Sequence, residues 1–449
     1  MRALTAGELC RAGVDSAPRA LEDAHPMWKR RSLVVLVLVA LAGPMTSCTC
    51  SEPPAAVPDA GSSTLTVQSF RLANGMEVEL VSGPCGDEAA IAVLFGGGRD
   101  HDPPGRSGMA EVVGRILASS GGENRVVEIG ADHTLDAIVV PSDRLLEEID
   151  RAAARIATAE LGDDAVATAR AAVLADVAAR HGGDPSLTAR SYAAESVQPT
   201  RGNGWRGGVA AEVEAIDRAQ VEAHRRAQLH PGAARLVVAG RFDASAVRAR
   251  IERAFASLPA GTPPVAREPA DSTVTGTLVM GDAPSVVALA VPAPPPADPL
   301  YAPFLVLASR LLGSTSQGES WDATYDPIAQ PETLLVVGAV RPGEQAEPAA
   351  ARIRAEVSAI LARPLAPADV DAARERFGSF LGVDELEPAR CDDDPRALAV
   401  ARARRAQLGL DAAALREALE GTTPEQVAAS VTRFEPTRTA AVIAGGAIR

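Results

Sequence analysis

Residues 65–449 alternate between short apolar runs and longer segments with helical periodicity. The runs 78–81 and 89–95 are rich in Val, Ile, Leu and Ala, which is typical of buried strands. In residues 108–118, apolar side chains at positions 109, 112, 113, 116 and 117 form one face of a predicted helix. Residues 145–157 and 163–180 are also predicted to be helical. The order of these elements indicates an α+β fold.

The second half of this region repeats the pattern of the first at an offset of about 200 residues. The matched segments are 90–93 with 286–289, 134–141 with 333–340, 164–170 with 369–374, and 235–240 with 439–445. We therefore predict two homologous domains, residues 65–262 and 270–449, joined by the Pro- and Gly-rich segment 258–264. Each is expected to be a mostly antiparallel sheet with helices packed on one face.

The N-terminal region has the pattern of a secretion signal. Lys29, Arg30 and Arg31 precede the apolar run 33–42, which is shorter than the roughly 20 residues that span a bilayer. Met27 is a candidate for the true start. The sequence Met45-Thr46-Ser47-Cys48 resembles a bacterial lipobox, which predicts lipidation of Cys48. Residues 1–47 are thus expected to be a leader and lipoprotein signal peptide, and 48–64 a Pro- and Ser-rich tether; a plain signal peptide is the alternative.

Charge and composition exclude several classes of function. The chain has 44 Lys and Arg against 58 Asp and Glu, a formal net charge of −14. Removal of residues 1–47, with six basic and four acidic side chains, changes this to 38 − 54 = −16. Nucleic-acid binding, which needs a basic surface, is not expected. Lys29 is the only lysine, so Schiff-base chemistry in the mature chain is excluded. Pairing of Cys85 with Cys391 stays open.

Three groups of short motifs resemble the pitrilysin/insulinase family of metallopeptidases, the class with an inverted zinc motif. Residues 70–78, Phe-Arg-Leu-Ala-Asn-Gly-Met-Glu-Val, match the opening pattern of that family, F-x-L-x-N-G-h-x-V with h apolar. Residues 96–110 match its Gly- and Ser-rich approach to the active-site helix. Residues 229–240 and 255–259 match the end of its first domain. The resemblance covers residues 65–449 and implies a two-domain, peptidase-like fold.

In active members of that family, an H-x-x-E-H helix supplies two zinc ligands and a glutamate base, and a later helix supplies a third ligand. The matching positions here hold Glu111, Gly114 and Arg115, followed by Asp176 on the later helix. A glycine cannot deprotonate water, and a guanidinium cannot bind zinc. The resemblance thus implies that the zinc site is lost, and we expect no catalytic residue, metal or other cofactor.

The charges at these positions suggest a replacement for the metal. Glu111 and Arg115 lie four residues apart, in the favourable order for an ion pair on a helix. We predict that Arg115 lies between Glu111 and Asp176 and supplies the positive charge that zinc supplies in active relatives. The alternative is that all three are solvated surface residues.

Other candidate residues are weaker. The second domain keeps Leu312-Gly313 of a family motif but lacks its substrate-binding Arg, and Tyr325 is the candidate for the substrate-contacting Tyr of active members. The triplet 100–102, Asp-His-Asp, has the composition of a surface chelate, but its place before two prolines favours a polar loop. Structural roles suffice for His133 and His230.

Together these features predict a catalytically inactive peptidase homologue, lipid-anchored on the periplasmic face of the outer membrane, with the cell surface as the alternative. The resemblance implies either a non-catalytic partner of a zinc-bearing homologous subunit or a peptide-binding protein. In the second case a peptide would add a strand at a sheet edge, for which Arg125–Ile129 is the candidate by its position in the family. The alternatives are an active zinc metalloendopeptidase with atypical ligands and a structural envelope lipoprotein.

Overall fold

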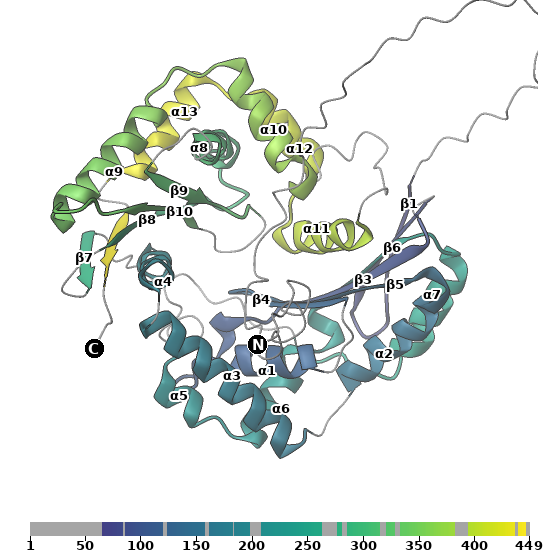
Figure 1. Cartoon of the computed structure of the whole chain (residues 1–449). Coiled ribbons are helices and arrows are strands. Elements are labelled where there is room, and N and C mark those ends of the chain that lie inside the picture. The colour runs from purple at the N-terminus through teal and green to yellow at the C-terminus, as the bar shows by residue number, and fades with distance from the viewer. Residues whose placement is uncertain are drawn as a thin grey trace, which may run out of the picture. The chain divides into compact units, whose positions relative to one another are not determined.

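Two sheets, one in each half of the chain, form the framework of the protein (Figure 1). The computed structural model describes residues 65–83, 86–119, 124–157, 161–182, 184–197, 208–262, 276–280, 285–314, 320–327, 333–381, 394–435 and 439–445. Both halves belong to one structural unit. The predicted signal peptide, Cys48, the tether, Cys85 and Cys391 lie outside the described residues.

The first sheet has the strand order β1-β2-β6-β3-β5-β4. Its strands are β1 (Thr66–Arg71), β2 (Glu77–Ser82), β3 (Glu88–Phe95), β4 (Arg125–Ile129), β5 (Thr134–Pro141) and β6 (Ala234–Gly240). All neighbours pair antiparallel except β2 and β6, which are parallel. At the turn between β1 and β2, Gly75 has a φ of 92°, a left-handed conformation that glycine adopts without strain. The strand β4 lies at one edge of the sheet, as predicted.

The second sheet, with the order β7-β11-β8-β10-β9, repeats the part β2-β6-β3-β5-β4 of the first, and no described strand corresponds to β1. Its strands are β7 (Gly276–Met280), β8 (Val286–Pro292), β9 (Trp321–Thr324), β10 (Thr333–Ala339) and β11 (Ala440–Ala444). The pair β7 and β11 is parallel, like β2 and β6, and the remaining pairs are antiparallel. The repeated pairing pattern supports the duplication inferred from the sequence.

Apart from α4 (Pro185–Val197) and α11 (Pro395–Leu408), the helices of each half lie on the same side of that half's own sheet and contribute to one apolar core. Those of the first half are α1 (Met109–Ser119), α2 (Leu145–Ala157), α3 (Asp163–Gly182), α4 (Pro185–Val197), α5 (Ala210–Glu214), α6 (Arg218–Gln228) and α7 (Ala244–Phe255). Those of the second are α8 (Tyr301–Ser314), α9 (Ala346–Leu361), α10 (Pro367–Leu381), α11 (Pro395–Leu408), α12 (Ala412–Glu420) and α13 (Pro424–Val431). The three helices predicted in the first half thus form as α1, α2 and α3.

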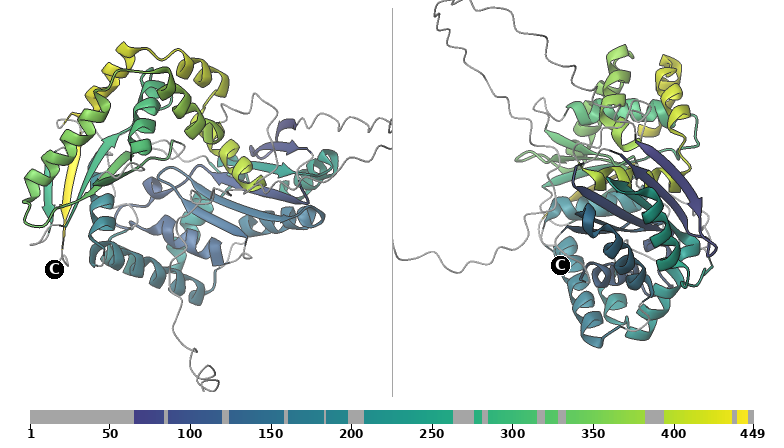
Figure 2. Two further views of the ribbon diagram at one scale, coloured as in Figure 1. Left: turned by 45° about the horizontal axis from the view of Figure 1, so that its top comes forward. Right: turned by 90° about the vertical axis from the view of Figure 1, so that its right-hand side faces the viewer.

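The other face of each sheet is covered by one helix from the opposite half (Figures 1 and 2). Helix α11 packs on β3, β5 and β6 through Ala399 and Ala403. Helix α4 packs on β8, β10 and β11 through Ala189 and Ala193. Small alanine side chains allow close approach of helix and sheet. This exchange explains why β3 is apolar on both faces, since neither face is exposed to water.

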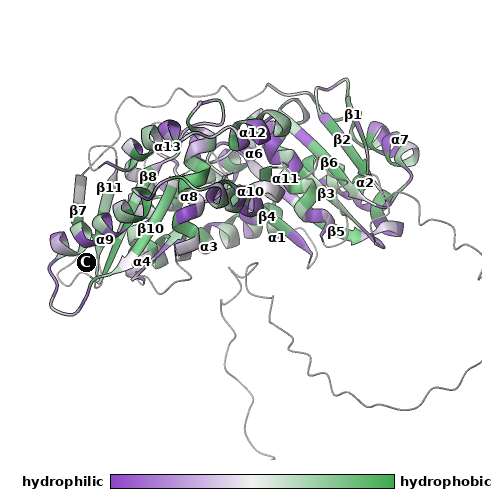
Figure 3. Cartoon of the chain, turned by 90° about the horizontal axis from the view of Figure 1, so that it is seen from above, coloured by the Kyte–Doolittle hydropathy of each residue, from purple (hydrophilic) through white to green (hydrophobic). Residues whose placement is uncertain are grey.

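The hydropathy of the chain follows this layering. The central strands of both sheets are mainly apolar, whereas outer helices such as α7 contain many hydrophilic residues (Figure 3). Within the described part of the chain, no helix combines the length and apolar character needed to cross a membrane.

Candidate functional site

Helix α1 carries three of the four positions of the predicted degenerate motif, and α3 carries the fourth. The apolar face of α1 is buried in the core of the first half, and the side chains of Glu111 and Arg115 lie outside that face. The start of the helix is held by Asp102, whose carboxylate accepts hydrogen bonds from the backbone N–H groups of Gly108 (2.7 Å) and Ala110 (2.8 Å). Acceptor oxygens at this end of a helix are favoured because its first N–H groups are otherwise unpaired.

The structure forms one of the two predicted ion pairs at the motif. Arg115 Nη2 donates to Asp176 Oδ2, as predicted, and the two side chains are about half exposed. Glu111 instead accepts from Arg99, with Nε and Oε1 2.6 Å apart, and among the described residues it makes no pair with Arg115. The prediction that Arg115 lies between two carboxylates is therefore wrong. Arg99 reaches Glu111 because its backbone N–H is bonded to the carbonyl of Gly130, at the end of β4.

At Gly114, which the family resemblance aligns with a catalytic base, the edge strand occupies the space that a side chain would need. A Cβ atom built on Gly114 would lie 2.5 Å from Cδ1 and 2.6 Å from Cγ1 of Ile129. Ile129 is the last residue of β4 and is almost fully buried. The absence of a side chain at Gly114 thus allows β4 to pack directly against α1.

The residues at this site do not fit a zinc ion. Only Glu111 and Asp176 could bind a metal, and each already accepts a hydrogen bond from an arginine. Protein zinc sites use three or four ligands. Elsewhere in the described residues, too, no group of three or more His, Cys, Asp or Glu side chains is placed to hold a metal ion.

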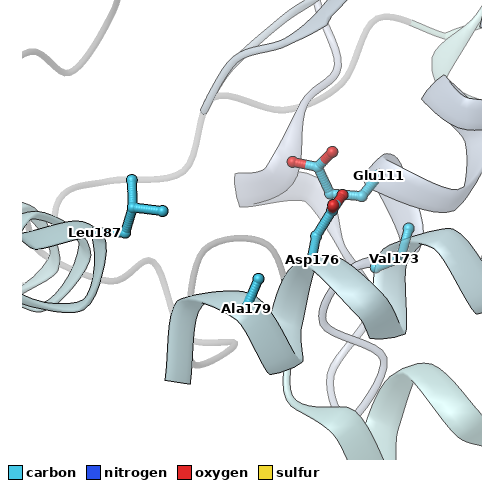
Figure 4. Close-up of a pocket in the computed structure, with 5 residues that line it drawn as sticks. All are labelled: Glu111, Val173, Asp176, Ala179 and Leu187. Carbon is cyan, nitrogen blue, oxygen red and sulfur yellow. The ribbon is translucent and has the colours of Figure 1, made fainter. Parts of the chain in front are cut away.

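Glu111 and Asp176 nevertheless share a pocket of about 300 Å³. The rest of its lining is apolar and consists of Val173 and Ala179 of α3 and Leu187 of α4. In Figure 4 both carboxylates lie on one side of this region, and Leu187 lies across from them. The structure therefore brings together two of the four motif residues around a cavity.

A buried ion network anchors the edge strand beside this pocket. The Arg125 side chain is 1% exposed, and its guanidinium donates to both carboxylate oxygens of Asp136 on β5, at 2.6 and 2.7 Å. It also donates to the carbonyl of Leu117 in α1, at 2.6 Å. Asp136 Oδ2 lies 3.6 Å from Nε of Arg155 on α2, and Arg155 pairs in turn with the buried Glu148. This network could not be predicted from the sequence, because its members show no periodic spacing.

The exchanged helix α11 contacts the same strand from the other face of the sheet. Arg404 of α11 forms ion pairs with Glu128 on β4 and with Asp326 of the second half. Gln407 donates to Asp132, just after β4, at 3.1 Å. The edge strand is thus held from both faces, by Arg125 on one and by Arg404 on the other.

A second buried polar pair lies behind the start of α1. His224 Nε2 of α6 is 3.8 Å from Asp102 Oδ1, and both side chains are almost completely buried. Burial raises the pKa of Asp102 to about 7, and burial lowers the pKa of His224 to about 4. Both groups are therefore neutral between these values. The sequence predicts a polar loop at Asp102, and the structure buries this side chain where it caps the start of α1.

Tyr325 lies within the aromatic part of the second core. Its ring makes edge contacts with Phe304 (centroids 5.5 Å apart) and Phe377 (6.0 Å). These contacts account for the aromatic ring through packing. The substrate role predicted for Tyr325 stays a prediction.

Replacement of Gly114 by alanine is expected to lower the free energy of unfolding by about 1–3 kcal/mol, because the new methyl group overpacks the contact with Ile129. Helix propensity alone would favour alanine by about 1 kcal/mol. Urea unfolding of the purified protein measures the difference.

The matched control is Gly313→Ala in α8, where a Cβ would meet only Nη2 of Arg376 at 3.7 Å. This variant should be unchanged or slightly more stable. Trimming the neighbour by Ile129→Val should reduce the cost of Gly114→Ala, because it removes Cδ1. Equal changes in the free energy of unfolding for Gly114→Ala and Gly313→Ala would show that Ile129 of β4 does not restrict the space at Gly114.

Comparisons with known proteins agree with this architecture. Residues 215–377 match the family model of the peptidase M16 inactive domain. A search of curated protein sequences found no match.

The fold is found in solved peptidase structures at low sequence identity. A protease from Helicobacter pylori has a TM-score of 0.68 and 16% identity, over 84% of this chain and 99% of that one. The peptidase M16 inactive domain from Pseudomonas fluorescens has a TM-score of 0.68 and 17% identity, over 85% and 98%. The ferredoxin protease FusC, in complex with Arabidopsis ferredoxin, has a TM-score of 0.59 and 15% identity, over 85% of this chain and 48% of FusC. The predicted fold and the predicted family resemblance are confirmed.

Proposed function

We propose that this chain, a degenerate homologue of the pitrilysin/insulinase (M16) peptidases, is catalytically inactive and binds extended peptides at the open edge of β4. The proposal rests on one observation: the motif positions are altered, whereas the edge strand β4 beside them is complete and anchored. The motif lacks a base at Gly114, and the motif arginine, Arg115, is paired with Asp176.

The register of β4 identifies the backbone groups that a peptide would meet. The backbone N–H of Val139 donates to the carbonyl of Asn124, and that of Gly130 donates to the carbonyl of His133. The even-numbered residues from 124 to 130 therefore form the backbone hydrogen bonds to β5. The N–H and C=O groups of Arg125, Val127 and Ile129 therefore point away from β5. No strand within the described ranges pairs with that side. Such an edge can accept an added strand.

Location and partnership are further parts of the proposal. The lipobox-like sequence supports lipidation at Cys48 and attachment to the periplasmic face of the outer membrane. The family resemblance supports pairing with a zinc-bearing homologous subunit that would hydrolyse the bound peptide. Mass spectrometry of the mature N-terminus tests the first, and co-purification of such a subunit with the full chain tests the second.

We expect fluorescently labelled decapeptides rich in Val and Thr to bind the protein without being cleaved. Peptides N-methylated on the alternate residues whose backbone N–H groups face β4 should lose binding, because each methyl group removes one hydrogen-bond donor to the edge strand. Peptides methylated on the other register should bind as before. Fluorescence anisotropy measures binding, and mass spectrometry of the peptide detects cleavage.

Equal binding of the two methylated registers would exclude strand addition. Cleavage by the purified chain, with stoichiometric zinc present, would overturn the assignment of inactivity and favour an active metalloendopeptidase with atypical ligands.

A further inference from the structure

We propose that the pocket between α1, α3 and α4 binds the cationic side chain of a lysine or arginine in the bound peptide. The inference rests on the proposed strand addition at β4 and specifies one residue of the peptide. It concerns the pocket lined by Glu111, Val173, Asp176, Ala179 and Leu187 (Figure 4).

The polar groups that face this pocket are acceptors only. Glu111 uses Oε1 for Arg99, and Asp176 uses Oδ2 for Arg115, which leaves Oε2 and Oδ1 without a donor from the described residues. The two arginines pair with these carboxylates but are not part of the lining. A carboxylate can accept several hydrogen bonds, so each can bind a second donor. Charged donors form the stronger bonds of this kind.

The remaining wall matches the aliphatic part of a long side chain. Val173 is 1% exposed and forms the base of the pocket, whereas Leu187 is 48% exposed at its rim. Lysine and arginine have an apolar stem and a charged end, and they bury the stem where the end can stay solvated or paired. Asp176, about half exposed, offers such a place.

The pocket lies at the end of the proposed peptide strand. Glu111 precedes Gly114 by one turn of α1, and Gly114 packs on Ile129, the last residue of β4. In addition, Arg99 bonds both to Glu111 and to the backbone of Gly130, directly after the strand. Side chains of an added strand that point to the same face as Ile129 would therefore project toward α1 and this pocket.

The neighbouring charges limit the size of the preference. Arg99 and Arg115 already neutralise one oxygen of each carboxylate and repel an incoming cation. We therefore expect one additional charge-assisted hydrogen bond, equivalent to roughly tenfold in affinity, rather than the effect of two unpaired carboxylates.

A positional scan with the full chain tests the proposal. Labelled Val/Thr decapeptides carry one lysine, norleucine or glutamate at each position in turn, and anisotropy gives the affinities. At one position lysine should bind about tenfold tighter than norleucine, and glutamate should bind more weakly than both. The variants Asp176→Asn and Glu111→Gln should reduce the ratio of lysine affinity to norleucine affinity at that position.

The matched control is Glu147→Gln on α2, which removes one exposed carboxylate outside the pocket lining and should keep the preference. Equal affinities for lysine and norleucine at every position would overturn the pocket assignment while leaving strand addition intact. Persistence of the preference in both pocket variants would also overturn it. If the wild-type protein bound none of the peptides, including those with norleucine, the proposed function itself would be excluded.

Discussion

The variant Asp136→Ala is expected to lower the free energy of unfolding by about 3–5 kcal/mol, the range for removal of one partner from a buried ion pair. Arg125 would keep its charge inside the first domain and lose both of its carboxylate contacts. The carbonyl of Leu117 can compensate only in part, because it is neutral. Since Arg125 begins β4, we also expect the edge strand to lose its position and peptide binding to fall. Urea unfolding and anisotropy measure the two effects.

Two controls separate the buried charge from a general sensitivity to mutation. The pair Arg248 and Glu252 on α7 is about half exposed, so Glu252→Ala should cost less than about 1 kcal/mol. The double variant Arg125→Met with Asp136→Leu should regain much of the stability, because it removes both charges together. A loss below 1 kcal/mol for Asp136→Ala would show that solvent reaches Arg125.

Variants of the pair Asp102 and His224 should make stability depend on pH in opposite directions. In the unfolded chain the two groups titrate near 3.8 and 6.5, whereas in the folded protein they titrate near 7 and 4. Between about pH 4 and 6.5 the folded pair holds one proton on Asp102, and the unfolded pair holds one on His224. The numbers of bound protons match, so the intact pair contributes almost no slope.

The variant Asp102→Asn leaves only His224, whose folded pKa is lowered. The stability that neutral His224 contributes is fully present above pH 6.5. About 3 kcal/mol of the free energy of unfolding should be lost as the pH falls toward 4. The variant His224→Gln leaves only Asp102, whose folded pKa is raised. The stability that protonated Asp102 contributes is fully present below pH 3.8. About 4 kcal/mol of the free energy of unfolding should be lost as the pH rises toward 7.

Urea unfolding between pH 4 and 7.5, with each variant compared with the wild type, measures these slopes. The neighbouring Arg99, His101 and Glu111 act on the pair electrostatically and are present in all three proteins. Slopes of the same sign in the two variants, or no slope in either, would show that the pair is hydrated in the folded protein.

Elements with strong local signals were predicted correctly from the sequence. The apolar positions 109, 112, 113, 116 and 117 do form the buried face of α1, and the runs 78–81 and 89–95 lie in β2 and β3. The Arg115–Asp176 pair was also predicted, because the family resemblance places both residues at one site.

Contacts between distant residues were missed or assigned to the wrong partner. Glu111 was expected to pair within its helix, but a more buried partner, Arg99, lies twelve residues away in the chain. An ion pair at helical spacing contributes only about 0.3–0.5 kcal/mol, so a shielded contact readily replaces it. The packing of Ile129 on Gly114 likewise depends on how far β4 approaches α1, which no local pattern records.

The sequence by itself determined the α+β fold and the positions of elements such as α1, β2 and β3, because these follow from local periodicity. The loss of zinc chemistry, which rests on the side chains at the motif, stays a prediction. Only the tertiary structure decided which groups meet: the exchange of α4 and α11 between the sheets, the anchoring of β4 by Arg125, and the pocket at Glu111 and Asp176. The physical reason is that local periodicity shows which face of an element is buried, whereas burial against a particular partner depends on residues that are far away in the chain.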